Sequence, residues 1–111
     1  MIQEEVLKIF KESGALLEGH FKLTSGLHSP HYFQCAQVLQ YPTHAQKLCW
    51  EIACQYMTDK ISVVIAPAVG GIVVAQEVAR LINSLAIFAE RAEGKMTLRR
   101  GSFIKPEENV M

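Results

Sequence analysis

The sequence predicts an α/β fold, and three observations support that prediction. A short β-branched run, Ile61–Ala66, has the composition of a buried parallel strand. Apolar residues then recur at helical spacing over residues 72–83, and a second apolar run follows at Leu85–Ala89. A strand, a helix and a second strand in this order form a βαβ unit, whose two strands share one parallel sheet.

The residues before this unit predict helices and a small cap. Apolar residues recur at helical spacing over residues 3–13, opposite charged side chains, and Gly14 is suited to end that helix. Short extended pieces at His20–Thr24 and His31–Cys35, separated by glycines and a proline, indicate a β-rich or irregular cap. A second helix is predicted to begin at Pro42. Its apolar stripe consists of Ala45, Leu48, Cys49, Ile52, Ala53 and Tyr56.

Composition limits the class of protein. The 111 residues suit one domain, and with 50% of them hydrophobic the chain has enough apolar side chains for a packed core. A formal net charge of zero gives no overall attraction to nucleic acid or to an anionic membrane, and no apolar run is long enough to span a bilayer. The acidic N-terminus does not resemble a signal peptide. We therefore expect a cytoplasmic protein with no nucleic-acid or membrane partner.

The cysteines and histidines do not predict a metal or disulfide site. The three cysteines lack C-x-x-C spacing, which argues against a disulfide framework and fits a reducing compartment. We expect Cys49 and Cys54, in a predicted helical stretch, to be small buried side chains. Pro30 separates His28 from His31 and excludes a regular helix there, so the usual zinc-ligand spacing is lost.

Three segments have the chemistry of a ligand site. The segment Ala66–Gly71 joins the end of a strand to the start of a helix, where paired glycines let N–H groups approach a phosphate; the alternative is a simple tight turn. The stretch Glu90–Gly101 is a solvent-facing loop or hairpin whose cations suit a multiply charged anion, unless it is only a solvated surface. Thr24–Phe33 combines hydroxyls with adjacent aromatics that suit a flat polar ring; the alternative is a structured turn with Phe33 in the core.

Together these segments resemble one family. Gly14–Leu17, Gly19–Gly26, Ala66–Ile72 and Phe88–Gly101 are similar, in order and spacing, to bacterial orotate phosphoribosyltransferases. The resemblance extends over roughly residues 14 to 110 and implies a type I phosphoribosyltransferase fold, a parallel sheet with an N-terminal hood over the active site. Residues 1–40 would be the N-terminal helix and hood, and residues 41–111 a partial α/β core with a basic loop at 90–101.

The resemblance also implies an activity and a set of site residues. The reaction would transfer ribose 5-phosphate from phosphoribosyl pyrophosphate (PRPP) to orotate, giving orotidine 5′-monophosphate and pyrophosphate in pyrimidine biosynthesis, with Mg²⁺ as cofactor and a homodimer as the working form. Orotate would contact Ser25, Gly26, Tyr32 and Phe33, and pyrophosphate would contact Ala68, Val69, Gly70 and Gly71. The catalytic cations would be Arg91, Lys95, Arg99 and Arg100.

The sequence departs from the family pattern in several places. Thr24 and Leu27 stand where many members have a lysine and an arginine, and Gly70 stands where many have a lysine. The family's PRPP motif, two acidic residues and a Thr/Gly-rich loop after an apolar strand, would begin just after Val110. We therefore expect one incomplete domain that is inactive by itself. Two alternatives stay open: a non-catalytic remnant that binds only anions or partners, and a phosphoribosyltransferase for another base.

Overall fold

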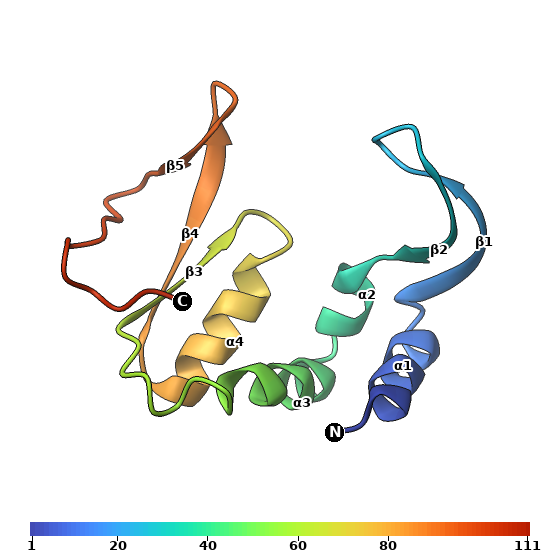
Figure 1. Ribbon diagram of the computed structural model, residues 1–111, viewed down its shortest axis with the longest axis horizontal. Helices are drawn as coiled ribbons and strands as arrows, with labels where there is room; N and C mark the ends of the chain where they lie inside the picture. Colours follow the sequence, from blue (N-terminus) through green and yellow to red (C-terminus); the bar gives the residue numbers. More distant parts are fainter. The chain divides into compact units, whose positions relative to one another are not determined.

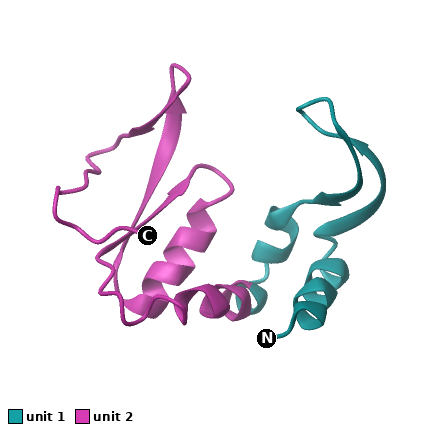
Figure 2. Ribbon diagram, viewed as in Figure 1, with its two compact units in different colours: residues 1–44 teal, residues 45–111 magenta.

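The computed structural model describes residues 1–111 and divides into two compact units, Met1–His44 and Ala45–Met111 (Figure 2). The division suggested by the sequence, between residues 40 and 41, lies close to this boundary. No helix in the structure is both long and apolar enough to cross a membrane.

The first unit is a helix followed by a β-hairpin and a short helix (Figure 1). Helix α1 spans Gln3–Glu12, and strands β1 (Leu16–Lys22) and β2 (His28–Phe33) pair antiparallel. Helix α2, Cys35–Leu39, follows directly. This short helix was not predicted, because one turn of helix is too short to give a periodic pattern.

Few apolar contacts hold the first unit together. The chain leaves α1 through Gly14 at φ +79°, a left-handed conformation that glycine adopts without steric cost. Phe10 of α1 packs edge-to-face on Phe33 of β2, with ring centroids 5.7 Å apart. Ala15 and Val38 are the two fully buried apolar residues of this unit. Phe33 remains 52% exposed, so the interpretation of Phe33 as a core residue is wrong.

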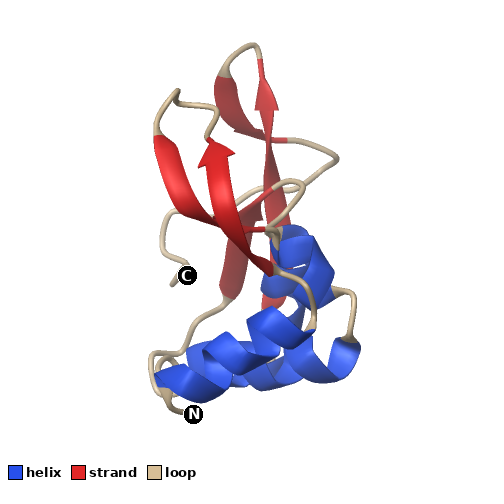
Figure 3. Ribbon diagram, turned by 90° about the vertical axis from the view of Figure 1, so that its right-hand side faces the viewer, coloured by secondary structure: helices blue, strands red, loops and turns tan.

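The second unit contains the predicted βαβ arrangement. Helix α3 (Pro42–Ala53) crosses the unit boundary, and β3 (Val63–Pro67), α4 (Ile72–Ile82) and β4 (Leu85–Ala92) follow it. Strands β3 and β4 pair in parallel, and β5 (Lys95–Leu98) pairs antiparallel with β4. Figure 3 distinguishes these strands, in red, from the helices, in blue. The parallel pair joined by α4 confirms the predicted α/β class.

The core of the second unit lies where α3 and α4 meet β3. Its buried members are small or β-branched: Cys49, Ala53, Val64, Ala75, Val78 and Ala79. Small side chains on both helices allow close packing against the strand. The spacing of apolar residues in the sequence therefore identified the core face of α4, but that of α3 only in part. Ala45, Cys49 and Ala53 are buried as predicted, whereas Ile52 and Tyr56 are exposed, and Tyr56 lies beyond the end of the helix.

A second parallel pairing forms on the other side of β3. Val110 makes a parallel bridge with Val63, and Met111 exchanges backbone hydrogen bonds with Val63 (3.0 Å) and Ile65 (2.9 Å). Asn109 positions this segment, because its side-chain amide donates to the carbonyls of Asp59 and Lys60. Val110 and Met111 thus begin to pair as a strand beside β3.

Several sequence-based details need correction. The cap strands begin earlier than predicted, because cross-strand pairing continues to Leu16↔Phe33 at the base of the hairpin. Strand β4 runs past Ala89 to Ala92, because its pairing with β5 extends it. It is less buried than predicted, and Leu85, next to the turn that ends α4, is 64% exposed. Cys54 is exposed and follows the end of α3, so the expectation that it is buried is wrong, whereas Cys49 is buried as expected.

Candidate functional site

The segment after β3 forms a tight turn with free backbone donors. Gly71 N–H donates to the Pro67 carbonyl at 3.0 Å, and Gly71 caps the N-terminus of α4. The peptide between Ala68 and Val69 is cis. The exposed N–H groups of Val69 and Gly70 have no acceptor within the chain. Free N–H groups beside a helix N-terminus favour an anion, so the turn and the anion-site interpretations are compatible.

The basic stretch is a β-hairpin, one of the two forms predicted for it. Its turn consists of Glu93 and Gly94, both with positive φ (+51° and +78°), as expected for a two-residue hairpin turn. Arg91 lies on β4 and donates from Nη1 to the carbonyl of Gly94 at 3.3 Å. Lys95 opens β5 and makes no ion pair. Both side chains therefore lie at the turn end of the hairpin.

The other two predicted cations share one carboxylate. Arg100 lies 2.9 Å from Glu90 Oε1, and Arg99 Nη1 lies 3.6 Å from Glu90 Oε2. The side chains of Arg99 and Arg100 are 57% and 69% exposed, whereas that of Glu90 is 18% exposed. The sequence analysis missed this role of Glu90. The register of the hairpin would have suggested this ion pairing, since Glu90 pairs with Thr97, which precedes Arg99 and Arg100 closely in the sequence.

The anion-directed segments lie together. The Ala68 N–H donates to the Ala89 carbonyl at 2.8 Å, which attaches the start of the Ala68–Gly71 turn to β4. Glu90 and Arg91 follow Ala89 directly, so the turn and the hairpin cations occupy the same edge of the sheet. This is the edge beyond the carboxyl ends of β3 and β4, where parallel sheets bind ligands.

The residues expected to face orotate do not form one cluster. Ser25 and Gly26 lie in the turn between β1 and β2, whereas Tyr32 and Phe33 pair with Leu17 and Leu16 at the opposite end of the hairpin. At about 3.3 Å per residue, the two pairs are separated by about 20 Å along the hairpin. Tyr32 packs near Phe21, with ring centroids 5.8 Å apart.

The structure offers no ready metal site. No group of three or more His, Cys, Asp or Glu side chains is placed to hold a metal ion. His28 lies against His20, with Nδ1 and Nε2 2.5 Å apart. All three cysteines are free thiols.

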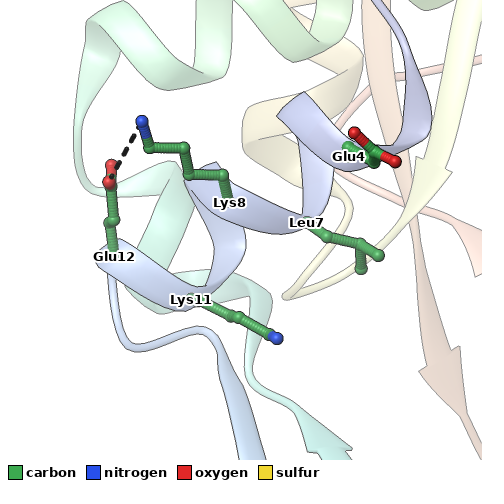
Figure 4. A pocket seen from close by; sticks show the side chains of 5 residues that line it. All are labelled: Glu4, Leu7, Lys8, Lys11 and Glu12. Carbon is green, nitrogen blue, oxygen red and sulfur yellow. Dashed lines mark ion pairs between the residues drawn. The ribbon is translucent and has the colours of Figure 1, made fainter.

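Two surface hollows lie away from the predicted site residues. One shallow hollow of about 320 Å³ lies along α1, where Lys8 and Glu12 form an ion pair at 3.8 Å (Figure 4). Another, of about 330 Å³, lies between β4 and the segment from Gly101 to Glu108. Neither contains a predicted orotate-binding or phosphate-binding residue.

Comparison with known proteins gives the relationship. Orotate phosphoribosyltransferase of Pelotomaculum thermopropionicum is 54% identical over 111 residues, covering 100% of this chain and 58% of that protein. The enzyme of the same name from Chlorobaculum parvum is 56% identical over the same lengths. The chain is homologous to orotate phosphoribosyltransferases along its whole length. It spans 58% of the length of these curated relatives, and no protein-family profile matches it.

Solved structures agree with this homology. The crystal structure of orotate phosphoribosyltransferase from Aeropyrum pernix superposes with a TM-score of 0.68 at 26% identity, covering 85% of this chain and 56% of that one. Leishmania donovani UMP synthase superposes with a TM-score of 0.73 at 18% identity, covering 96% of this chain and 23% of that one. The second likeness concerns the fold alone. The resemblance and the fold predicted from the sequence are therefore confirmed.

Proposed function

We propose that this chain provides the N-terminal part of an orotate phosphoribosyltransferase of pyrimidine biosynthesis. The reaction breaks the bond between C1 of the PRPP ribose and pyrophosphate and forms a bond from C1 to N1 of orotate. The observation that carries the proposal is the identity of 54% along the whole chain to a relative with that name.

The Ala68–Gly71 turn and the hairpin cations would act on the pyrophosphate of PRPP. Negative charge develops on pyrophosphate as its bond to C1 breaks, and preorganised donors stabilise such charge. The free N–H groups of Val69 and Gly70 support this role, as does the positive charge of Arg91 on β4, two residues after Ala89. Lys95, Arg99 and Arg100 would add positive charge when the hairpin closes over the ligand.

The first unit would recognise the base. The aromatic rings of Tyr32 and Phe33 are partly exposed, which supports contact with a flat polar ring. Ser25 and Gly26 lie too far along the hairpin to touch the same face of that ring, so we propose that they contact another part of the bound substrates.

We also propose a requirement for Mg²⁺, although the residues of this chain do not form a site for it. No three ligating side chains converge, and the carboxylate of Glu90 already pairs with two arginines. Mg²⁺ is commonly held by phosphate oxygens, water and only one or two carboxylates, so no residue here is assigned to it. A homodimer and a cytoplasmic location complete the proposal, and the free cysteines support a reducing compartment.

The test compares two proteins in an assay that follows conversion of orotate to orotidine 5′-monophosphate with PRPP and Mg²⁺. One is the 111-residue chain, and the other joins residues 1–111 to the remaining part of the Pelotomaculum relative. These 111 residues contain no acidic pair followed by a Thr/Gly-rich loop. Since each lost hydrogen bond to a charged phosphate costs about 1.5–3 kcal/mol, we expect no measurable turnover by the chain alone.

We expect the joined protein to turn over orotate and not hypoxanthine. Replacing Arg91 by Ala in it should lower kcat/KM by at least about tenfold, since a lost charged hydrogen bond costs roughly 1.5–3 kcal/mol. A joined protein that folds but does not use orotate contradicts the proposal. Turnover by the 111-residue chain contradicts only the expectation that the chain is inactive alone.

A further inference from the structure

The feature that the proposed reaction leaves unused is the carboxylate of Glu90. Its two oxygens are shared between two arginines: Oε1 accepts from Nε of Arg100 at 2.9 Å and also contacts Nη2, and Oε2 lies 3.6 Å from Nη1 of Arg99. Glu90 is the least exposed member of this trio. A fixed anion therefore holds two exposed cations from the base of the hairpin.

The contact uses the donors that a phosphate would need. A guanidinium recognises carboxylate and phosphate through the same edge, with two parallel N–H donors. In Arg100 that edge is formed by Nε and Nη2, and both face Glu90. Arg100 cannot present this edge to a ligand and to Glu90 at the same time.

The remaining cations differ in this respect. Arg91 donates to the uncharged carbonyl of Gly94, and Lys95 makes no ion pair. An arriving anion therefore meets Arg91 and Lys95 without displacing another charge. It gains the Nε and Nη2 edge of Arg100 only by taking it from Glu90, and it competes with Glu90 for Nη1 of Arg99.

We propose that Glu90 is an internal competitor of the anionic ligand, which holds Arg99 and Arg100 until a pyrophosphate group displaces its carboxylate. This inference rests on the proposed function for the nature of the ligand. It makes Glu90 a positioning residue, because it acts through the arginines and not on the reacting atoms. Pyrophosphate carries more negative charge than one carboxylate, so it can displace the Glu90 carboxylate from the arginines.

The experiment measures binding of inorganic pyrophosphate to the 111-residue chain by NMR, following the Nε–Hε signals of the arginines. Glu90→Gln keeps the size of the side chain and removes its charge. The matched control is Glu93→Gln, which makes the same change of net charge in the turn of the same hairpin, where Glu93 has no ion pair. An exposed ion pair contributes up to about 1 kcal/mol, so Glu90→Gln should tighten Kd up to about fivefold.

Glu93→Gln should change Kd much less. Equal tightening in both variants would mean that only net charge matters, and weaker binding in Glu90→Gln would mean that Glu90 organises the site; either result overturns the proposal. A second measurement uses the unaltered chain, so it remains valid if the variant misfolds. The side-chain carboxyl ¹³C signal of Glu90 should shift during the pyrophosphate titration, and its Kd should equal the Kd obtained from the Arg100 signal. A Glu90 signal that stays constant, or a hairpin that binds no pyrophosphate, also overturns it.

The outcome separates this inference from the proposed function. If orotate turnover by the joined protein is observed but the two glutamine variants bind alike, the competition is refuted and the function stands. If the joined protein is inactive while Glu90→Gln binds pyrophosphate more tightly than Glu93→Gln, the competition stands and the function is refuted.

Discussion

Among the glycines of the chain, Gly71 has the least space for a side chain. A Cβ atom built there would lie 2.7 Å from the Cβ of Ala66 and 2.8 Å from the carbonyl oxygen of Pro67. Neither neighbour is the end of a flexible side chain. The backbone of Gly71 has φ −87°, which any residue adopts, so the problem is space and not conformation. Gly71→Ala must therefore move the end of β3 or the start of α4.

The size of the effect follows from this overlap. Forcing an extra methyl group into a tightly packed position costs typically about 1–3 kcal/mol. Such a loss lowers the melting temperature of a small domain by about 4–8 °C per kcal/mol. We expect Gly71→Ala to lower the melting temperature by about 10 °C. The same displacement would move the free N–H groups of Val69 and Gly70 and weaken pyrophosphate binding.

Gly70 supplies the matched control. A Cβ atom at Gly70 meets nothing within 4 Å. The substitution Gly70→Ala adds the same methyl group one position earlier in the same turn. Gly70→Ala should leave stability unchanged or raise it by up to about 1 kcal/mol, because alanine restricts the unfolded chain. Thermal unfolding followed by circular dichroism measures both variants. Equal melting temperatures for the two would refute the reasoning that Gly71 is required by close packing.

Two further predictions concern α4 and the thiols. The hydrogen bond from Arg80 holds the pKa of Glu77 below its usual 4.5. The ionised Glu77 side chain therefore stabilises the fold above pH 4.5, and this contribution is lost as the pH falls through the lowered pKa. In urea unfolding at a series of pH values, Glu77→Gln should lose less stability on acidification than the unaltered chain. Burial raises the pKa of the Cys49 thiol, and Cys35 and Cys54 are exposed, so a thiol reagent should modify two cysteines rapidly and the third only on unfolding. Three equally fast reactions would contradict the buried position of Cys49.

The βαβ unit was predictable because each of its elements carries a local pattern. Strand β3 lies largely within the β-branched run Ile61–Ala66. Helix α4 covers most of the residues with helical spacing, 72–83. The exact strand ends were not predictable. Ala92 belongs to β4 because β5 pairs with it, and such pairing depends on a distant segment and not on local composition.

The candidate site was predictable in its segments but not in its contacts. The glycine pair and the basic stretch stand out by composition, and the structure brings them to one edge of the sheet. Composition shows Glu90 only as the first residue of the basic stretch, whereas the hairpin makes it the partner of two arginines. Likewise, Ser25 and Tyr32 are close in sequence but lie at opposite ends of a hairpin, because an extended strand separates them.

The distribution of these segments between the two units has a consequence for binding. The turn at Ala68–Gly71 and the cations from Arg91 to Arg100 lie within the second unit, and the Ala68–Ala89 hydrogen bond joins their strands directly. The residues proposed for orotate all lie in the first unit. Since no residue of the first unit is needed to form the anion-directed edge, changes in the β1–β2 hairpin should alter recognition of the base without altering affinity for pyrophosphate. The competition between Glu90 and the ligand is likewise a property of the second unit, so it persists whatever base the first unit selects.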